Sequence, residues 1–176
     1  LSIADGSLQS VDLNEVRLTR ADRLSLKTAL NGGSYRVTVR GARFDARALI
    51  KQAMEQNHKR SGSQTKDNSR LVVSAQIDEV TGFHGETLKN LAVSYEKAGS
   101  RVSGLSINAT TSSGKKFTAT NNDQEGARSL TSRSEDAGAV LRFFDFYDKM
   151  RGGKISVGLA GQGDGPLSGQ IDARDF

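Results

Sequence analysis

The sequence predicts a mostly β fold with two helices, of the α+β class, in which repeated hairpins form an elongated, curved antiparallel sheet. Apolar residues alternate with polar ones along many strand-length segments, and nineteen glycines accompany a single proline among 176 residues. Only 35% of the residues are hydrophobic, and the mean hydropathy is −0.50. A sheet with one solvated face needs an apolar residue only at every second position, so this composition favours a thin, open structure over a thick core.

The first predicted repeat covers residues 1–57. Its alternation runs from Leu8 to Arg20 and slips by one residue at Asn14-Glu15, which predicts a bulge or turn. Asn31-Gly32-Gly33 predicts a tight hairpin, because these residues accept positive φ angles. Asp45 is then a candidate cap for a helix that extends to about Asn57. The residues predicted to face inward on this helix are Ala48, Leu49 and Met54, with Ile50 as a further candidate.

A polar stretch, residues 58–69, predicts a loop or linker before the second repeat, residues 70–176. In this repeat alternating strands follow one another with turns about 12 to 16 residues apart, as in a meander of hairpins. Residues 121–126 are predicted to form a loop. A second capped helix is predicted from Ser134-Glu135-Asp136 to about Met150, with two further strands after it. Because the chain begins at Leu1 and reaches Phe176 within a predicted strand, we expect a longer parent protein.

The two predicted helices begin with similar sequences. Asp45-Ala46-Arg47-Ala48-Leu49-Ile50 matches Asp136-Ala137-Gly138-Ala139-Val140-Leu141, and each copy follows a strand. Asp172-Ala173-Arg174 is a fainter third copy. The repeating unit is therefore a set of strands followed by a capped helix, and units that stack side by side produce an elongated sheet.

The second predicted helix is unusually aromatic. Of the ten aromatic residues in the chain, four lie here: Phe143, Phe144, Phe146 and Tyr147. At about 100° per residue, the apolar residues of this segment would cover an arc of roughly 220°, which is more than packing on one sheet face requires. Phe146 lies closest to the polar side. Either a neighbouring loop covers the surplus, or it contacts a lipid, a membrane or a protein partner.

No pattern in the chain indicates catalysis or metal binding. There are no cysteines, and the two histidines, His58 and His84, have no ligand at metal-binding spacing. Residues 161–165 are rich in glycine but lie between strands, which predicts a hairpin turn instead of a phosphate loop. Residues 121–125 lack the spacing of a calcium loop. We therefore expect a protein that is not an enzyme and has no cofactor. The net charge of +5 is scattered, so nucleic acid is not an expected partner.

Three segments resemble the C-terminal region of AsmA-like envelope proteins, the group that includes AsmA, TamB and YhdP. The middle one, Asp136-Ala137-Gly138-Ala139-Val140-Leu141 with residues 147–153, resembles the family pattern D-A-G-A-x-L…Y-D-x-[IM]-R-G-G and is the most specific. Residues 77–80 with 85–91 resemble a strand followed by G-E-x-L-x-N, and residues 164–169 with 175–176 resemble the last turn and strand. The likeness covers about 100 residues; residues 1–69 match only in texture.

This resemblance implies a periplasmic segment of a large protein that is anchored in the inner membrane of a bacterium, most typically a proteobacterium. It implies phospholipid as the cargo, carried along an apolar sheet face in lipid transport or outer-membrane homeostasis, with the other repeats of the parent and further envelope proteins as partners. No catalytic residues are implied. The candidate lipid or partner contacts are Phe143, Phe144, Phe146, Tyr147, Leu71, Val73, Ile77, Leu91, Val93, Leu105, Ile107, Ile155 and Val157.

Two alternatives remain at this stage. The segment could be a structural or protein-interaction module of an envelope protein without a ligand of its own, which predicts a closed core and open sheet edges. A basic module that binds nucleic acid or an anionic polysaccharide would require clustered Lys and Arg side chains. Whether the apolar sheet face is open or filled distinguishes the lipid carrier from the structural module.

Overall fold

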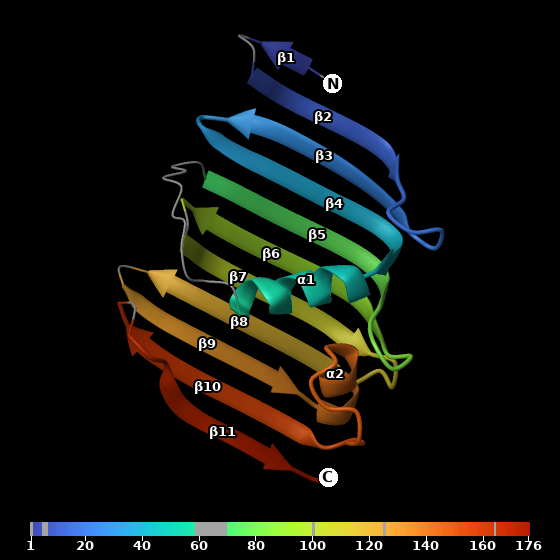
Figure 1. Cartoon of the computed structure of the whole chain (residues 1–176), viewed down its shortest axis with the longest axis vertical. Helices are drawn as coiled ribbons and strands as arrows, with labels where there is room; N and C mark the ends of the chain where they lie inside the picture. Colours follow the sequence, from blue (N-terminus) through green and yellow to red (C-terminus); the bar gives the residue numbers. More distant parts are fainter. Residues whose placement is uncertain (1, 5–6, 59–69, 100, 125, 164) are drawn as a thin grey trace.

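Eleven strands of the described residues form one open sheet, in which they lie side by side in sequence order (Figure 1). This computed structural model describes residues 2–4, 7–58, 70–99, 101–124, 126–163 and 165–176. The strands are β1 (Ser2–Ala4), β2 (Ser7–Val16), β3 (Arg23–Asn31), β4 (Ser34–Asp45), β5 (Arg70–Thr81), β6 (Thr87–Ala98), β7 (Arg101–Thr111), β8 (Lys116–Gln124), β9 (Ala127–Ser134), β10 (Lys154–Gln162) and β11 (Ser168–Arg174). The predicted fold class, an elongated sheet of repeated hairpins with two helices, is confirmed.

All neighbouring strands are antiparallel except β4 and β5, which pair in parallel. The helix α1 (Arg47–His58) lies in the connection between them, because a parallel pair needs a long crossover. The two predicted repeats therefore share one continuous sheet. The linker predicted at residues 58–69 lies outside the described residues, apart from His58 at the end of α1. The predicted bulge in the first segment is present, since the pairing of β2 with β3 shifts between Leu13 and Val16.

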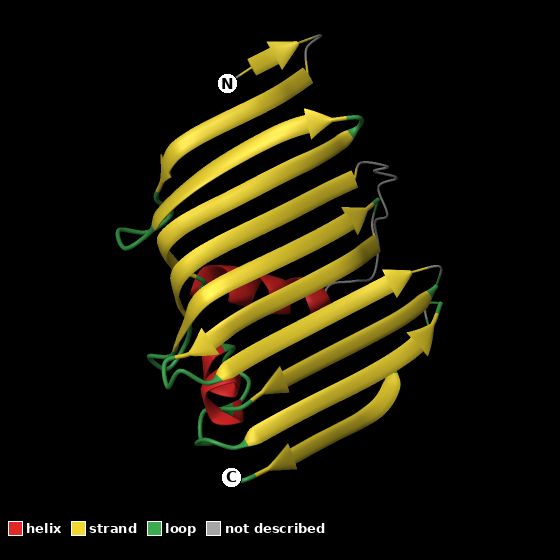
Figure 2. Ribbon diagram, turned by 180° about the vertical axis from the view of Figure 1, so that it is seen from behind, coloured by secondary structure: helices red, strands yellow, loops and turns green. Residues whose placement is uncertain are grey.

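The core lies on one face of the sheet. Both α1 and the second helix, α2 (Ala137–Phe143), lie against this face near the ends of the strands that precede them (Figure 2). Ile50 of α1 and Val140 and Phe143 of α2 belong to one buried cluster with sheet residues such as Val80 and Phe117. Neither of the two helices in the described residues lies on the opposite face of the sheet (Figures 1 and 2).

The helix α2 is shorter than predicted and ends at Phe143 instead of Met150. The backbone leaves the helix because Asp145 adopts a left-handed conformation with φ of 60°. The N–H of Phe146 then donates to the carbonyl of Leu141 at 2.9 Å, five residues back, in place of the helical partner. Phe144, Phe146 and Tyr147 consequently lie in the loop that follows the helix, and the arc predicted for them does not exist.

Two further predictions were wrong in detail. On α1, Ile50 and Met54 face the core, whereas Ala48 and Leu49 are exposed, so the inward face is rotated from the one predicted. The sequence Asn121-Asn122-Asp123-Gln124, predicted as a loop, is the second half of β8. These polar residues stay extended because each pairs with a residue of β9, beginning with Asn121 opposite Leu130.

Candidate functional site

The helix-bearing face of the sheet is apolar across strands β4 to β7 because the registers align apolar residues from strand to strand. One row places Val39 beside Ala75, Ala75 beside Val93, and Val93 beside Ile107. A second row lies two residues away from the first on each strand and consists of Val37, Val73, Tyr95 and Leu105. Alternate side chains of a strand point to the same face, so the two rows form one apolar surface.

The opposite face is polar at the same level. There the row runs through six consecutive strands and consists of Thr38, Ser74, Ser94, Ser106, Thr120 and Thr131. The sheet is thus strongly amphipathic. Hydroxyl side chains can remain solvated on a bare face, whereas the apolar face gains free energy from any cover that removes it from water.

The helices cover only part of the apolar face. Ile77 and Leu88 are buried in the core cluster, and Leu91, Ile107 and Ala119 pack against it. The uncovered residues are half-buried and lie outside that cluster; we call them the open apolar strip: Val37, Leu71, Val73, Val93, Tyr95 and Leu105. Among the described residues, one part of the face is therefore filled by the core, and the other part stays half-buried outside it.

Beyond β7 the apolar strip is interrupted. Asn121 of β8 lies beside Leu105, and Ser132 of β9 lies beside Ala119. Apolar residues resume at Leu130 of β9, beside Asn121, and continue with Leu159 of β10; both are half-buried. The longest apolar row on this face runs without interruption from β2 to β8 and consists of Leu13, Leu26, Val39, Ala75, Val93, Ile107 and Ala119.

The residues predicted as contacts occupy three environments. Leu71, Val73, Val93 and Leu105 lie in the open apolar strip, and Ile155 and Val157 lie on the same face of β10. Ile77, Leu91 and Ile107 lie in or against the core, as do Phe143 and Phe144. Phe146 and Tyr147 are exposed. Val37 and Tyr95 belong to the strip but were not predicted as contacts, although their alternation with polar neighbours was visible in the sequence.

The turn between β5 and β6 holds α2 against the sheet. Arg142 of α2 and Glu86 of this turn form an ion pair whose side chains are only 11% and 13% exposed, with 2.8 Å between Nε and Oε1. The same guanidinium donates to the carbonyl of Met150. The Phe143 ring lies so close to Gly82 that a Cβ at Gly82 would be 2.3 Å from it, which explains the glycine there. The polar contacts of Arg142 and the packing of Phe143 on Gly82 thus fix α2 against the sheet.

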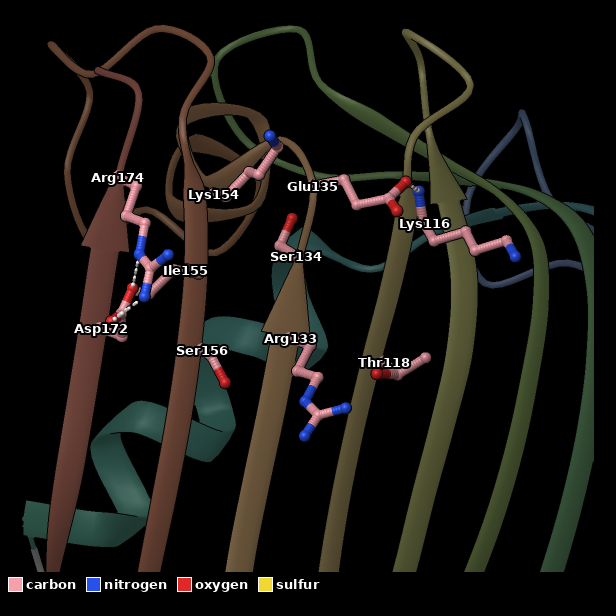
Figure 3. A pocket seen from close by; sticks show the side chains of 10 residues that line it. All are labelled: Lys116, Thr118, Arg133, Ser134, Glu135, Lys154, Ile155, Ser156, Asp172 and Arg174. Atoms are coloured by element: carbon pink, nitrogen blue, oxygen red, sulfur yellow. Dashed lines mark hydrogen bonds and ion pairs between the residues drawn. The ribbon is translucent and has the colours of Figure 1, made fainter.

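A shallow hollow on the helix-free face lies across β8 to β11 (Figure 3). Its charged side chains are only partly paired. Arg174 forms two hydrogen bonds with Asp172 and thereby lowers the pKa of that carboxyl. Lys154 pairs with Asp175, which does not line the hollow, at 3.0 Å. Lys116 and Arg133 also line it, so the basic side chains there outnumber the acidic ones by four to two.

In the part of the chain that the structure describes, no group of three or more His, Cys, Asp or Glu residues could hold a metal ion. His84 forms an ion pair with Asp145, at 2.6 Å between Nε2 and Oδ1, and both residues are partly exposed. This pair joins the β5–β6 turn to the loop after α2. Among the described residues, no helix has the length and hydropathy that a membrane crossing demands.

Comparison with known protein families, curated proteins and solved structures gave no match. The geometry of the sheet is thus the main guide to function, beside the resemblance noted in the sequence.

Proposed function

We propose that this chain is a non-enzymatic segment of an AsmA-like envelope protein, and that it carries phospholipid on the open apolar strip. The observation that supports this proposal most strongly is the strip itself, in which half-buried apolar side chains line a part of the face that the helices leave uncovered. Acyl chains would shield these side chains from water, which favours binding by about 25 cal/mol for each Å² of apolar surface covered.

The cellular setting is part of the same proposal and rests on the resemblance alone. The segment would lie in the periplasm as part of a larger protein anchored in the inner membrane. It would serve phospholipid transport or outer-membrane homeostasis together with the other repeats of that protein. A sheet that binds lipid by shape and hydrophobicity needs no catalytic group.

The test uses two substitutions on β7 that add the same carboxylate to opposite faces. Leu105→Asp places a charge in the open apolar strip, whereas Ser106→Asp places it on the polar face. We expect the purified chain to bind a fluorescent phospholipid analogue. Leu105→Asp should weaken this binding about tenfold, because a carboxylate is costly to desolvate, and Ser106→Asp should leave it unchanged.

The readout is a fluorescence titration, together with mass spectrometry of lipid that co-purifies with the chain. Circular dichroism establishes whether both variants remain folded. Equal binding by the two variants, or a chain that neither co-purifies with lipid nor binds the analogue, would refute the proposal.

The second candidate is a structural or interaction module without its own ligand. It is favoured by the sheet edge at β11, which pairs with β10 on one side only in the described part of the chain. An unpaired edge is a template for a further strand. A lipid-free chain that instead associates through this edge would support the module.

A further inference from the structure

The loop that follows α2, residues 144–151, exposes two aromatic side chains side by side in the sequence. Phe146 is 65% exposed and Tyr147 is 51% exposed. We call residues 144–151 the aromatic loop. Adjoining exposed aromatic residues on a protein surface indicate a contact with a membrane or with another molecule.

The exposure of Phe146 is built into the loop. The ring of Phe146 stacks on that of Phe144, with 5.8 Å between the ring centroids, and Phe144 packs against the core. The amide groups of Phe146 and Tyr147 both donate to the carbonyl of Leu141. The left-handed turn at Asp145 is held by the ion pair with His84. The two side chains are therefore presented in a fixed direction at little cost in conformational entropy.

Basic residues flank the two aromatic side chains. Lys149 and Arg151 are exposed within the loop, and neither forms an ion pair with a described residue, although the Arg151 guanidinium donates to the carbonyls of Asp148 and Met150. Asp145, which pairs with His84, and Asp148 are the opposing exposed charges. Lys51 of α1 adds a further positive charge nearby. Its Nζ lies 5.6 Å from the centre of the Phe83 ring, and the N–H of Phe83 donates to the carbonyl of Phe143. Counted with Lys51, the basic side chains around the exposed rings outnumber the acidic ones by three to two.

We propose that the aromatic loop docks the chain on the surface of an anionic phospholipid bilayer. Phe146 and Tyr147 enter the boundary between headgroups and acyl chains, and Lys149 and Arg151 contact the phosphates. Aromatic side chains are favoured at this boundary, and each basic residue near an anionic surface adds about 1 kcal/mol of attraction. A protein partner fits less well, because two rings in one short loop offer much less than the roughly 800 Å² per partner of a stable interface.

This docking is independent of lipid carriage on the sheet, because the aromatic loop lies outside the open apolar strip. Leu105→Asp should therefore weaken binding of the lipid analogue without affecting vesicle binding. Substitutions in the aromatic loop should weaken vesicle binding without affecting binding of the lipid analogue. The failure of one proposal can therefore be told from the failure of the other.

The test is cosedimentation of the full chain with vesicles of phosphatidylcholine, alone or partly replaced with phosphatidylglycerol. We expect binding to the anionic vesicles that declines with added salt. The double variant Phe146→Ser, Tyr147→Ser should bind about tenfold more weakly, since it loses the apolar contribution to interfacial binding. Leu18→Ser is the matched control, because Leu18 is 73% exposed in the turn between β2 and β3, and this variant should bind like the parent chain.

A second pair of substitutions tests the charges. The double variant Lys149→Glu, Arg151→Glu should lose the preference for anionic vesicles. It should bind them as weakly as it binds phosphatidylcholine vesicles. The proposal is overturned if the parent chain binds neither vesicle, or if the double aromatic variant binds as the parent does. It is equally overturned if the chain ignores vesicles and forms a dimer in light scattering that the aromatic substitutions dissociate, because the loop is then a protein contact.

Discussion

The helices α1 and α2 start from nearly the same six residues, yet they are attached to the sheet in different ways. In α2, Asp136 caps the helix, since its Oδ1 accepts from the N–H of Ala139 at 3.0 Å. In α1, the carboxylate of the corresponding Asp45 instead accepts from the side chain and the backbone N–H of Arg47. The helices also begin one position apart in the shared stretch, at Arg47 and at Ala137, so the shared sequence alone fixes neither where a helix begins nor how it is held.

The position after the shared Asp-Ala explains much of the divergence. Gly138 lies against the chain at Met150, where a Cβ would come within 2.7 Å of the carbonyl oxygen, so the arginine of the first copy does not fit there. Arg47 stays on the surface of α1. Four consecutive residues of α2 are buried, Ala137 to Val140, whereas α1 buries Ile50 and exposes Leu49. We therefore expect α2 to be the more firmly held helix.

The largest effect is expected at the ion pair that fastens α2. Glu86→Ala leaves Arg142 with a mostly buried, uncompensated charge, which should lower the free energy of unfolding by about 3 kcal/mol. Glu86→Gln retains a hydrogen-bond acceptor and should cost less. Urea denaturation of the three chains measures this order, and a Glu86→Ala variant as stable as the parent would show that the ion pair does not anchor α2.

A smaller effect is expected at α1. Ile50→Ala removes the main buried side chain of this helix and should cost about 2 kcal/mol, whereas Leu49→Ala, at an exposed position, should cost less than about 0.5 kcal/mol. Hydrogen exchange should show faster exchange in α1 than in α2 in the parent chain. Similar losses from both substitutions would mean that α1 is not oriented by Ile50.

The helix cap should contribute about 1 kcal/mol. Asp136→Ala removes the acceptor for the Ala139 N–H, and this is the usual cost of a lost cap. Asp136→Asn retains the acceptor and serves as the control, so thermal denaturation should place it between the alanine variant and the parent. An unchanged melting temperature for Asp136→Ala would argue that the packing of Phe143 alone positions α2.

The weakest effect is a dependence on pH at α1. Hydrogen bonds from Arg47 lower the pKa of Asp45 below its usual value. The stabilisation is therefore present above the pKa of the unfolded carboxyl, about 3.9, and is lost as pH falls through the lower folded value. The parent should be slightly more stable than Asp45→Asn at neutral pH and should lose this advantage in acid. Asp172→Asn removes a similar pair on the edge strand β11, and its contrast with Asp45→Asn isolates the contribution of the helix.

Strands were predictable because alternation is a local property. The segments around Val37, Val73 and Leu105 alternate visibly and all became strands. The stretch Asn121 to Gln124 was missed because nothing local marks it as extended, and pairing with β7 and β9 makes it so. The end of α2 was missed for a similar reason. The residues from Phe144 to Tyr147 suit a helix, but the carbonyl of Leu141 and the His84–Asp145 pair stabilise a different backbone.

The sequence by itself determined an amphipathic, repeated β structure with two helices, because periodicity, turn residues and composition are written along the chain. The tertiary structure decided which part of the apolar face is covered and which aromatic residues reach the surface. Those outcomes depend on contacts between residues far apart in sequence, such as Glu86 with Arg142 and Gly82 with Phe143. Phe143 and Phe146 are only three residues apart, yet one is buried and the other exposed, because the chain leaves the helix between them.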